Sequence, residues 1–312
     1  QNFNFTLTID QKKCIEEINL DLRSDLKMFR ILQGDVGSGK TIVSFISAAN
    51  VIKAGYQVAM MAPTEILAKQ HFDLAKKIFK STKISIEILT GKTLSKDKKA
   101  IQDNLLSGKI NLLIGTHALF QKNTLFKKLG LVIIDEQHKF GVKQRIELSN
   151  KGGNDCDILL MSATPIPRTL IMTVYGDMDV SRIVEKPKNR KSIITLSKPE
   201  EKIDEVLNFI SRQIKNKKQI FWVCPLIDES KKLDFSAAVK KYNFLSKKFL
   251  NRVGLVHGAL KKNIKDEVLN KFLNKKIDIL VSTTVIEVGI DFPNANVIII
   301  ENANKFGLSQ LH

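Results

Sequence analysis

The sequence has few cysteines, few histidines and no long apolar segment. Its 312 residues include three cysteines, Cys14, Cys156 and Cys224, which lie far apart and form no Cys-x-x-Cys pair. This usage predicts neither a disulfide framework nor a zinc knuckle, and we expect three buried, reduced thiols in a cytoplasmic protein. The five histidines have no paired spacing, so no metal site of His and Cys side chains is predicted either.

Segments that would target the chain to a membrane are also missing from the sequence. No uninterrupted apolar run approaches the roughly 18 residues that a membrane span needs. No basic stretch followed by an apolar one opens the chain, so no secretory signal is predicted. We therefore expect no membrane partner. Because the first residue is Gln1 rather than Met, we expect the chain to be a piece of a longer product.

Positive charge is what the sequence has in excess. Lys and Arg together number 50 against 32 Asp and Glu, which gives a formal net charge of +18. A surplus of this size indicates a polyanionic partner, most plausibly nucleic acid. Only eight of the basic residues are Arg, so biased codon usage rich in Lys is an alternative explanation, and charge alone leaves both open.

Short β-branched and leucine-rich runs alternate with helical segments along almost the whole chain. Such runs are typical of parallel sheets whose two faces are both covered, so the fold class predicted is α/β. Strands are expected at 28–33, 57–62, 84–89, 110–115, 131–135, 158–162, 193–196, 220–223, 253–256, 277–281 and 297–300. Helices are expected at 8–22, 41–54, 65–79, 200–215, 235–250 and 262–274.

A charged segment that contains a proline, residues 185–191, interrupts this alternation. Charge and proline between two periodic regions are typical of a linker. A chain of 312 residues also suggests two domains at roughly 150 residues each. We therefore predict an α/β domain at 1–185 and a second at 192–312, with a cleft between them.

A phosphate-binding loop is predicted between the first strand and the helix that follows it. Residues 34–41, GDVGSGKT, fit the pattern G-x-x-x-x-G-K-[ST]. Glycines let backbone amides point at phosphate oxygens, and the helix N-terminus attracts anions. Lys40 should reach the β and γ phosphates, and the Thr41 hydroxyl should ligate Mg²⁺. The nucleotide-binding residues of the loop are thus Gly34, Gly37, Ser38, Gly39, Lys40 and Thr41.

An acidic pair, Asp135 and Glu136, follows the apolar run at 131–134. A parallel sheet displays such residues at its carboxyl edge, beside the phosphate loop. Asp135 is then the partner of Mg²⁺, and Glu136 orients and polarises the attacking water. Taken alone, the pair could simply be solvated; with the phosphate loop upstream, it predicts hydrolysis with Lys40, Asp135 and Glu136 as catalytic residues.

Gln11 lies upstream of the loop in the segment LTIDQ. Its amide could bind the edge of adenine, or it could complete a capping box with Thr8 at the start of the first helix. The sequence leaves both roles open.

The ordered motifs together resemble the helicase core of superfamily 2, and within it the RecG family of branched-DNA helicases. The Mfd family of transcription-repair translocases shares only some of them, such as ATPIPRT and the FGV after the acidic pair. The motifs are LTIDQ, LQGDVGSGKT, APTEILAKQH, IGTHALFQ, VIIDEQHKFGVKQR, MSATPIPRT, WVCPLIDES, VHG, TTVIEVGIDFPNA and IENANKFGLSQLH.

The resemblance implies two RecA-like domains that use ATP and Mg²⁺ and hold DNA mainly by its phosphates. DNA contacts are implied for Pro63, Thr64, Gly115, Thr116, His117, His257, Gly258, Thr283 and Thr284. Coupling between ATP and DNA is implied for His138, Ser162 and Thr164, and closure of the ATP site from the second domain for Gly289 and Asp291. Each has a structural alternative; Thr64, for example, could be the N-cap of the next helix.

Together these expectations predict an ATP-dependent DNA helicase or translocase. It would remodel branched DNA, such as forks and Holliday junctions, in recombination and repair. An Mfd-like translocase and a nucleotide-gated nucleic-acid clamp without turnover are the alternatives. The chain ends at His312, where the family continues into an arginine-bearing motif. The resemblance thus implies a truncated second domain, and we expect this chain to bind DNA weakly and hydrolyse ATP slowly.

Overall fold

The computed structural model describes residues 6–121, 123–135, 156–163, 178–185, 193–225, 231–283 and 292–306. The chain divides into two compact units, residues 1–191 and 192–312. Most of the predicted linker, residues 186–191, lies outside the described ranges. Each unit is an α/β structure built on a parallel sheet, which confirms the predicted fold class.

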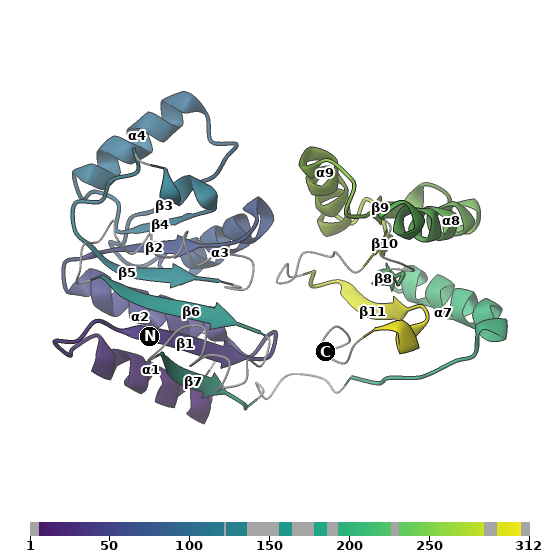
Figure 1. Ribbon diagram of the computed structural model, residues 1–312, viewed down its shortest axis with the longest axis horizontal. Coiled ribbons are helices and arrows are strands. Elements are labelled where there is room, and N and C mark those ends of the chain that lie inside the picture. Colours follow the sequence, from purple (N-terminus) through teal and green to yellow (C-terminus); the bar gives the residue numbers. More distant parts are fainter. Residues whose placement is uncertain are drawn as a thin grey trace. The chain divides into compact units, whose positions relative to one another are not determined.

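The first unit contains seven strands in the described part of the chain, in the order β3-β4-β2-β5-β6-β1-β7, and Figure 1 shows them side by side. Every pair in this sheet is parallel. The strands are β1 (Phe29–Gly34), β2 (Gln57–Met61), β3 (Ile86–Leu89), β4 (Leu112–Gly115), β5 (Leu129–Ile134), β6 (Asp157–Ser162) and β7 (Asp179–Ile183). The helices are α1 (Ile9–Asp21), α2 (Lys40–Lys53), α3 (Glu65–Ile78) and α4 (Ser95–Leu106).

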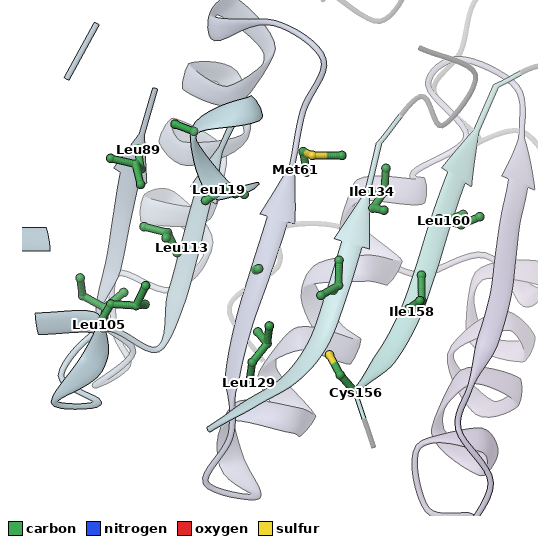
Figure 2. Packing of buried hydrophobic residues seen from close by; sticks show 14 of the residues in the cluster. Met61, Leu89, Leu105, Leu113, Leu119, Leu129, Ile134, Cys156, Ile158 and Leu160 are labelled. Atoms are coloured by element: carbon green, nitrogen blue, oxygen red, sulfur yellow. The ribbon is translucent and has the colours of Figure 1, made fainter. Parts of the chain in front are cut away.

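The central strands of this sheet are buried on both faces. All residues of β2 and β5 are buried, and alternate residues of a strand point to opposite faces. Figure 2 shows one of the two layers, in which Met61, Ile134 and Leu160 lie next to one another on three neighbouring strands. Burial on both faces explains why these strands are continuous apolar runs and why their polar residues stand at the strand ends.

A buried arginine holds α1 against the sheet. Arg30 of β1 donates from Nε to Oδ2 of Asp21 at 2.6 Å and from Nη2 to Oδ1 at 3.1 Å. Its Nη1 also donates to the hydroxyl of Ser181 in β7 at 3.0 Å. A planar guanidinium that binds a carboxylate through two bonds has a fixed orientation. The C-terminal end of α1 is therefore tied to β1 and β7.

The second unit has four described strands in the order β11-β8-β10-β9, all parallel. They are β8 (Gln219–Val223), β9 (Val253–Val256), β10 (Ile279–Ser282) and β11 (Ala295–Ile300), with helices α7 (Ile203–Lys215), α8 (Lys231–Phe249) and α9 (Lys262–Leu273). The single tryptophan, Trp222, is fully buried in the core of this unit. The two units also share a detail: Gln57 and Gln219, each opening a strand, donate from a buried amide to two backbone carbonyls.

Most predicted elements are confirmed to within one or two residues, but the strand predicted at 193–196 is wrong. Residues 193–199 form no regular structure, and Ile193, Ile194 and Leu196 are each at least 77% exposed. A β-branched run becomes a strand only where another strand pairs with it. Two elements were not predicted: α4 and β7, which is half-exposed at the edge of the sheet.

The three cysteines are free and buried, as expected. Burial raises the pKa of the Cys14 thiol to about 11 and the pKa of the Cys156 and Cys224 thiols to about 12. Among the described residues, no helix is long and apolar enough to cross a membrane.

Candidate nucleotide and nucleic-acid site

The predicted phosphate loop connects the carboxyl end of β1 to the first residue of α2, as its mechanism requires. Two of its glycines, Gly37 and Gly39, have φ angles of 78° and 92°, which side-chain-bearing residues rarely adopt. At Gly39 a Cβ atom would also lie 2.3 Å from Nε2 of Gln11, so the Gln11 side chain would have to move. The loop therefore depends on glycine for its backbone conformation, and a side chain at position 39 would displace Gln11.

The side chain of Lys40 lies along this loop. Its ammonium group donates to the carbonyl of Gly34 at 2.5 Å and to that of Asp35 at 3.1 Å, and the residue is 9% exposed. The first N–H groups of α2 have no partner within the helix. A positive charge and these N–H groups lie at the same place, which is the arrangement that binds anions at a helix N-terminus.

Gln11 joins α1 to the phosphate loop. Its Oε1 accepts from the backbone N–H of Thr8 at 3.0 Å, and the Thr8 hydroxyl accepts from Gln11 N–H at 3.3 Å, so the predicted capping box is confirmed. The amide nitrogen Nε2 donates to the carbonyl of Ser38 at 2.7 Å. The contact to Ser38 was not predicted; contact of Gln11 with adenine stays a prediction.

Asp135 follows β5 and lies at the same carboxyl edge of the sheet as the loop. In the sheet order, β6 alone stands between β5 and β1, so these two strands are about 10 Å apart at roughly 4.8 Å per spacing. Asp135 is 7% exposed, and its Oδ2 lies 2.7 Å from Nε2 of His71 in α3. Its backbone N–H donates to the carbonyl of Met61 in β2 at 2.9 Å.

The donor set at this edge fits a magnesium–nucleotide complex. The hydroxyl of Ser38, 1% exposed, has no hydrogen-bond partner among the described residues and lies inside the phosphate loop. Thr41 and Asp135 would offer a hydroxyl and a carboxylate to Mg²⁺, which prefers hard oxygen ligands, and phosphates and water would complete its shell. The described part of the chain contains no group of three or more His, Cys, Asp or Glu placed to hold a metal ion.

The residues predicted to contact DNA from the first unit also lie at this edge, but over other strands. Pro63 and Thr64 follow β2, and Thr116 and His117 follow Gly115 at the end of β4, the strand paired with β2. Thr64 caps α3, since its hydroxyl accepts from Leu67 N–H at 3.2 Å, which confirms the structural alternative without testing a DNA contact.

Ser162 ends β6 and is fully buried beside Gln33 of β1. It thus stands between the strand that precedes Asp135 and the strand that precedes the phosphate loop. In the strand order, which can be followed in Figure 1, β4 and β2 precede the predicted DNA residues, whereas β5 and β1 precede Asp135 and the phosphate loop.

In the second unit the predicted DNA residues that the structure describes also gather at one edge. His257 and Gly258 follow β9, and Thr283 follows β10, the strand paired with it; Thr283 N–H donates to the carbonyl of Val256 at 3.4 Å. Burial, and to a smaller extent the charge of Lys265, lowers the pKa of His257. Gly258 is exposed, and a Cβ atom at this position would meet no described atom within 4 Å.

Six predicted site residues lie outside the described residues, and their predicted roles are untested. They are Glu136, His138, Thr164, Thr284, Gly289 and Asp291.

One site residue was not predicted in its present role. His71 is one of the five histidines for which the sequence predicted no metal site, yet its Nε2 lies 2.7 Å from Oδ2 of Asp135. Its buried position on α3 follows the spacing of Ala68 and Ala75, so a polar residue on an apolar helix face was the signal. That signal does not identify Asp135 as the partner. His71 lies on the helix after β2 and Asp135 follows β5, and the sequence does not show that these two strands are neighbours.

Models of known families match both units of the chain. Residues 8–173 match the DEAD/DEAH box helicase model, and residues 201–312 match that of the helicase conserved C-terminal domain. The first match alone covers more than half of the chain. The chain belongs to the DEAD/DEAH box helicase family. The predicted kinship with superfamily 2 helicases is thereby confirmed.

Within these helicases, the chain is similar to proteins named ATP-dependent DNA helicase RecG. It is 48% identical over 310 residues to those of Bacillus subtilis and Thermotoga maritima, matching 99% of this chain and 45% and 40% of the relatives. A solved structure of RecG bound to a three-way DNA junction matches with a TM-score of 0.87 and 45% identity, over 99% of this chain and 40% of that one. The chain thus spans less than half the length of these relatives.

Proposed function

We propose that this chain is the motor core of an ATP-dependent DNA helicase that remodels branched DNA. The observation that carries the proposal is the order of residues along one sheet edge: phosphate loop at β1, Ser162 at β6, Asp135 after β5, and the turns after β2 and β4. The RecG relatives support DNA as the partner and favour this function over that of an Mfd-like translocase.

In the proposed nucleotide site, each residue has a separate task. The loop amides and the Lys40 ammonium bind the phosphates, and Thr41 and Asp135 hold Mg²⁺, which when bound offsets the negative charge of the phosphates. Glu136 orients and polarises the attacking water. Ser162 lies between the two halves of this site, a position suited to transmitting their state to the neighbouring strands.

Four residues of the first unit are proposed to contact the DNA phosphates: Pro63, Thr64, Thr116 and His117. In the second unit, the same role is proposed for His257, Gly258 and Thr283. The net charge of +18 supports binding to a polyanion. Contacts to phosphates carry no base information, so binding should depend on salt and on branch shape more than on sequence.

The test compares Lys40→Ala with Lys53→Ala, an exposed lysine at the last turn of the same helix. Loss of a charge-assisted bond of about 1.5 to 3 kcal/mol predicts roughly 10- to 100-fold weaker binding of a fluorescent ATP analogue with Mg²⁺ for Lys40→Ala. Lys53→Ala should bind as the wild type does.

The same variants test the link to DNA. Addition of the ATP analogue should change the affinity for a three-way junction in the wild type and in Lys53→Ala, but not in Lys40→Ala. Unchanged nucleotide affinity in Lys40→Ala would refute the phosphate-loop assignment. Measurement of ATP turnover in the presence of junction DNA distinguishes a motor from a clamp. A clamp would change its DNA affinity when nucleotide binds but would not hydrolyse the nucleotide.

A further inference from the structure

His71 and Asp135 form a buried pair that links two elements 64 residues apart in the sequence. His71 is 6% exposed and Asp135 7%, and their closest atoms, Nε2 and Oδ2, are 2.7 Å apart. An ionised carboxylate only accepts hydrogen bonds, so a hydrogen bond in this pair requires the proton on Nε2. When Asp135 is ionised, as a metal ligand must be, the imidazole is the donor through Nε2.

Both members of the pair are held rigidly. His71 lies on the buried face of α3 with Ala68 and Ala75, and the helix begins at a capped residue, Thr64. The backbone of Asp135 is fixed separately by its bond to the Met61 carbonyl. Backbone and side chain of the acid are thus both tied to the segment formed by β2 and α3.

A carboxylate offers about four acceptor sites, so it can accept this bond and still ligate a metal ion. Hydrogen bonds to metal-binding groups from residues behind them fix the orientation of the ligand, and their loss commonly weakens metal binding.

We infer that His71 is a positioning residue, which holds the Asp135 carboxylate in the orientation that ligates the Mg²⁺ of a bound nucleotide. The inference rests on the proposed function, because it requires Asp135 to be the Mg²⁺ ligand. A merely structural histidine would satisfy the buried carboxylate without affecting the metal, so the response to Mg²⁺ distinguishes the two roles.

The experiment measures how much Mg²⁺ is needed for half-maximal enhancement of binding of a fluorescent ATP analogue to the purified chain, without turnover. Four variants are compared with the wild type: His71→Leu, His71→Gln, Asp135→Asn and Lys77→Leu. Leu at position 71 removes the donor, whereas Gln places an amide nitrogen near the position of Nε2. Lys77→Leu, at an exposed position of the same helix, is the control.

We expect His71→Leu to raise the required Mg²⁺ concentration by about 10- to 100-fold. His71→Gln should restore most of this loss, and Lys77→Leu should match the wild type. Nucleotide affinity measured in EDTA should be unchanged in His71→Leu, which shows that the phosphate loop is intact.

The inference is overturned if His71→Leu needs no more Mg²⁺ than the wild type while Asp135→Asn does. If His71→Leu fails to fold, His71→Gln decides: a folded variant with a Mg²⁺ requirement near that of the wild type supports the donor role, and a tenfold higher requirement overturns it. An unchanged requirement in Asp135→Asn would instead remove the proposed role of Asp135 itself.

Discussion

The contact between Gln11 and the phosphate loop supports a specific prediction, because two substitutions separate the two hydrogen bonds of the Gln11 side chain. One bond is to the carbonyl of Ser38 and the other is to the backbone N–H of Thr8. Gln11→Glu keeps the methylenes and the oxygen that accepts from Thr8 N–H, but it replaces the donor to the Ser38 carbonyl by an acceptor. Gln11→Ala removes both bonds. Lys12→Gln, on the exposed face of the same helix, is the control and changes the charge by the same amount as Gln11→Glu.

The magnitude follows from the burial of the contact. Gln11 is 4% exposed, so loss of its amide donor leaves the carbonyl of Ser38 without this partner in a buried place. Such a loss costs about 1 to 3 kcal/mol. Gln11→Ala adds the loss of the capping-box bond, about 0.5 to 1.5 kcal/mol. Lys12→Gln should stay within about 0.5 kcal/mol of the wild type.

Urea unfolding is followed by two probes, so that unfolding of the first unit can be distinguished from unfolding of the second. The single tryptophan, Trp222, is buried in the second unit, so its fluorescence reports that unit, whereas far-UV circular dichroism reports both. The Gln11 variants should shift the dichroism transition and leave the fluorescence transition in place. If Gln11→Glu unfolds at the same urea concentration as the wild type, the contact with the loop does not stabilise the first unit.

The same variants distinguish the two roles that the sequence left open for Gln11. If the amide only holds the loop, the affinities for ATP and GTP analogues should fall together. A preferential loss of ATP affinity would show that Gln11 also contacts the adenine. This comparison needs no assumption about hydrolysis.

Two further predictions concern the same unit. Gly115→Ala should destabilise it by about 1 to 3 kcal/mol in urea unfolding, because a Cβ there would lie 2.2 Å from the carbonyl oxygen of Leu89. The control is Gly91→Ala, whose Cβ would make only an ordinary contact at 3.4 Å. Equal stability of the two variants would contradict the argument. Asp10 accepts from Glu185 N–H at 2.7 Å and from another backbone N–H of the same segment, and these bonds lower its pKa. The stability that the Asp10 carboxylate contributes should thus be present above the unfolded pKa of about 3.9 and disappear as the pH falls through the lower native pKa. The free energy of unfolding of Asp10→Asn should differ from that of the wild type at pH 6 and approach it in acid. A constant difference across this range would refute the assignment.

The local features of the site were predictable from the sequence because each depends on neighbouring residues. The glycine turn, the strand before it and the helix after it are encoded within residues 28–54, and the structure places β1 and α2 there. The Thr8–Gln11 capping box and the Thr64 cap follow from side chains three residues from their partners. Short β-branched and leucine-rich runs likewise predicted most strands.

The order of strands was not predictable, since a strand buried on both faces looks the same at any position in a parallel sheet. Only the tertiary structure placed β2 beside β5, which brings His71 to Asp135, and placed the Ser38 carbonyl against Gln11. It also decided that residues 193–196 pair with no described strand, although their composition favours one. The sequence by itself thus determined which chemical groups this protein carries and the turns that present them. Which groups meet was decided by packing between distant segments, because such contacts depend on the whole sheet and not on any one stretch of it.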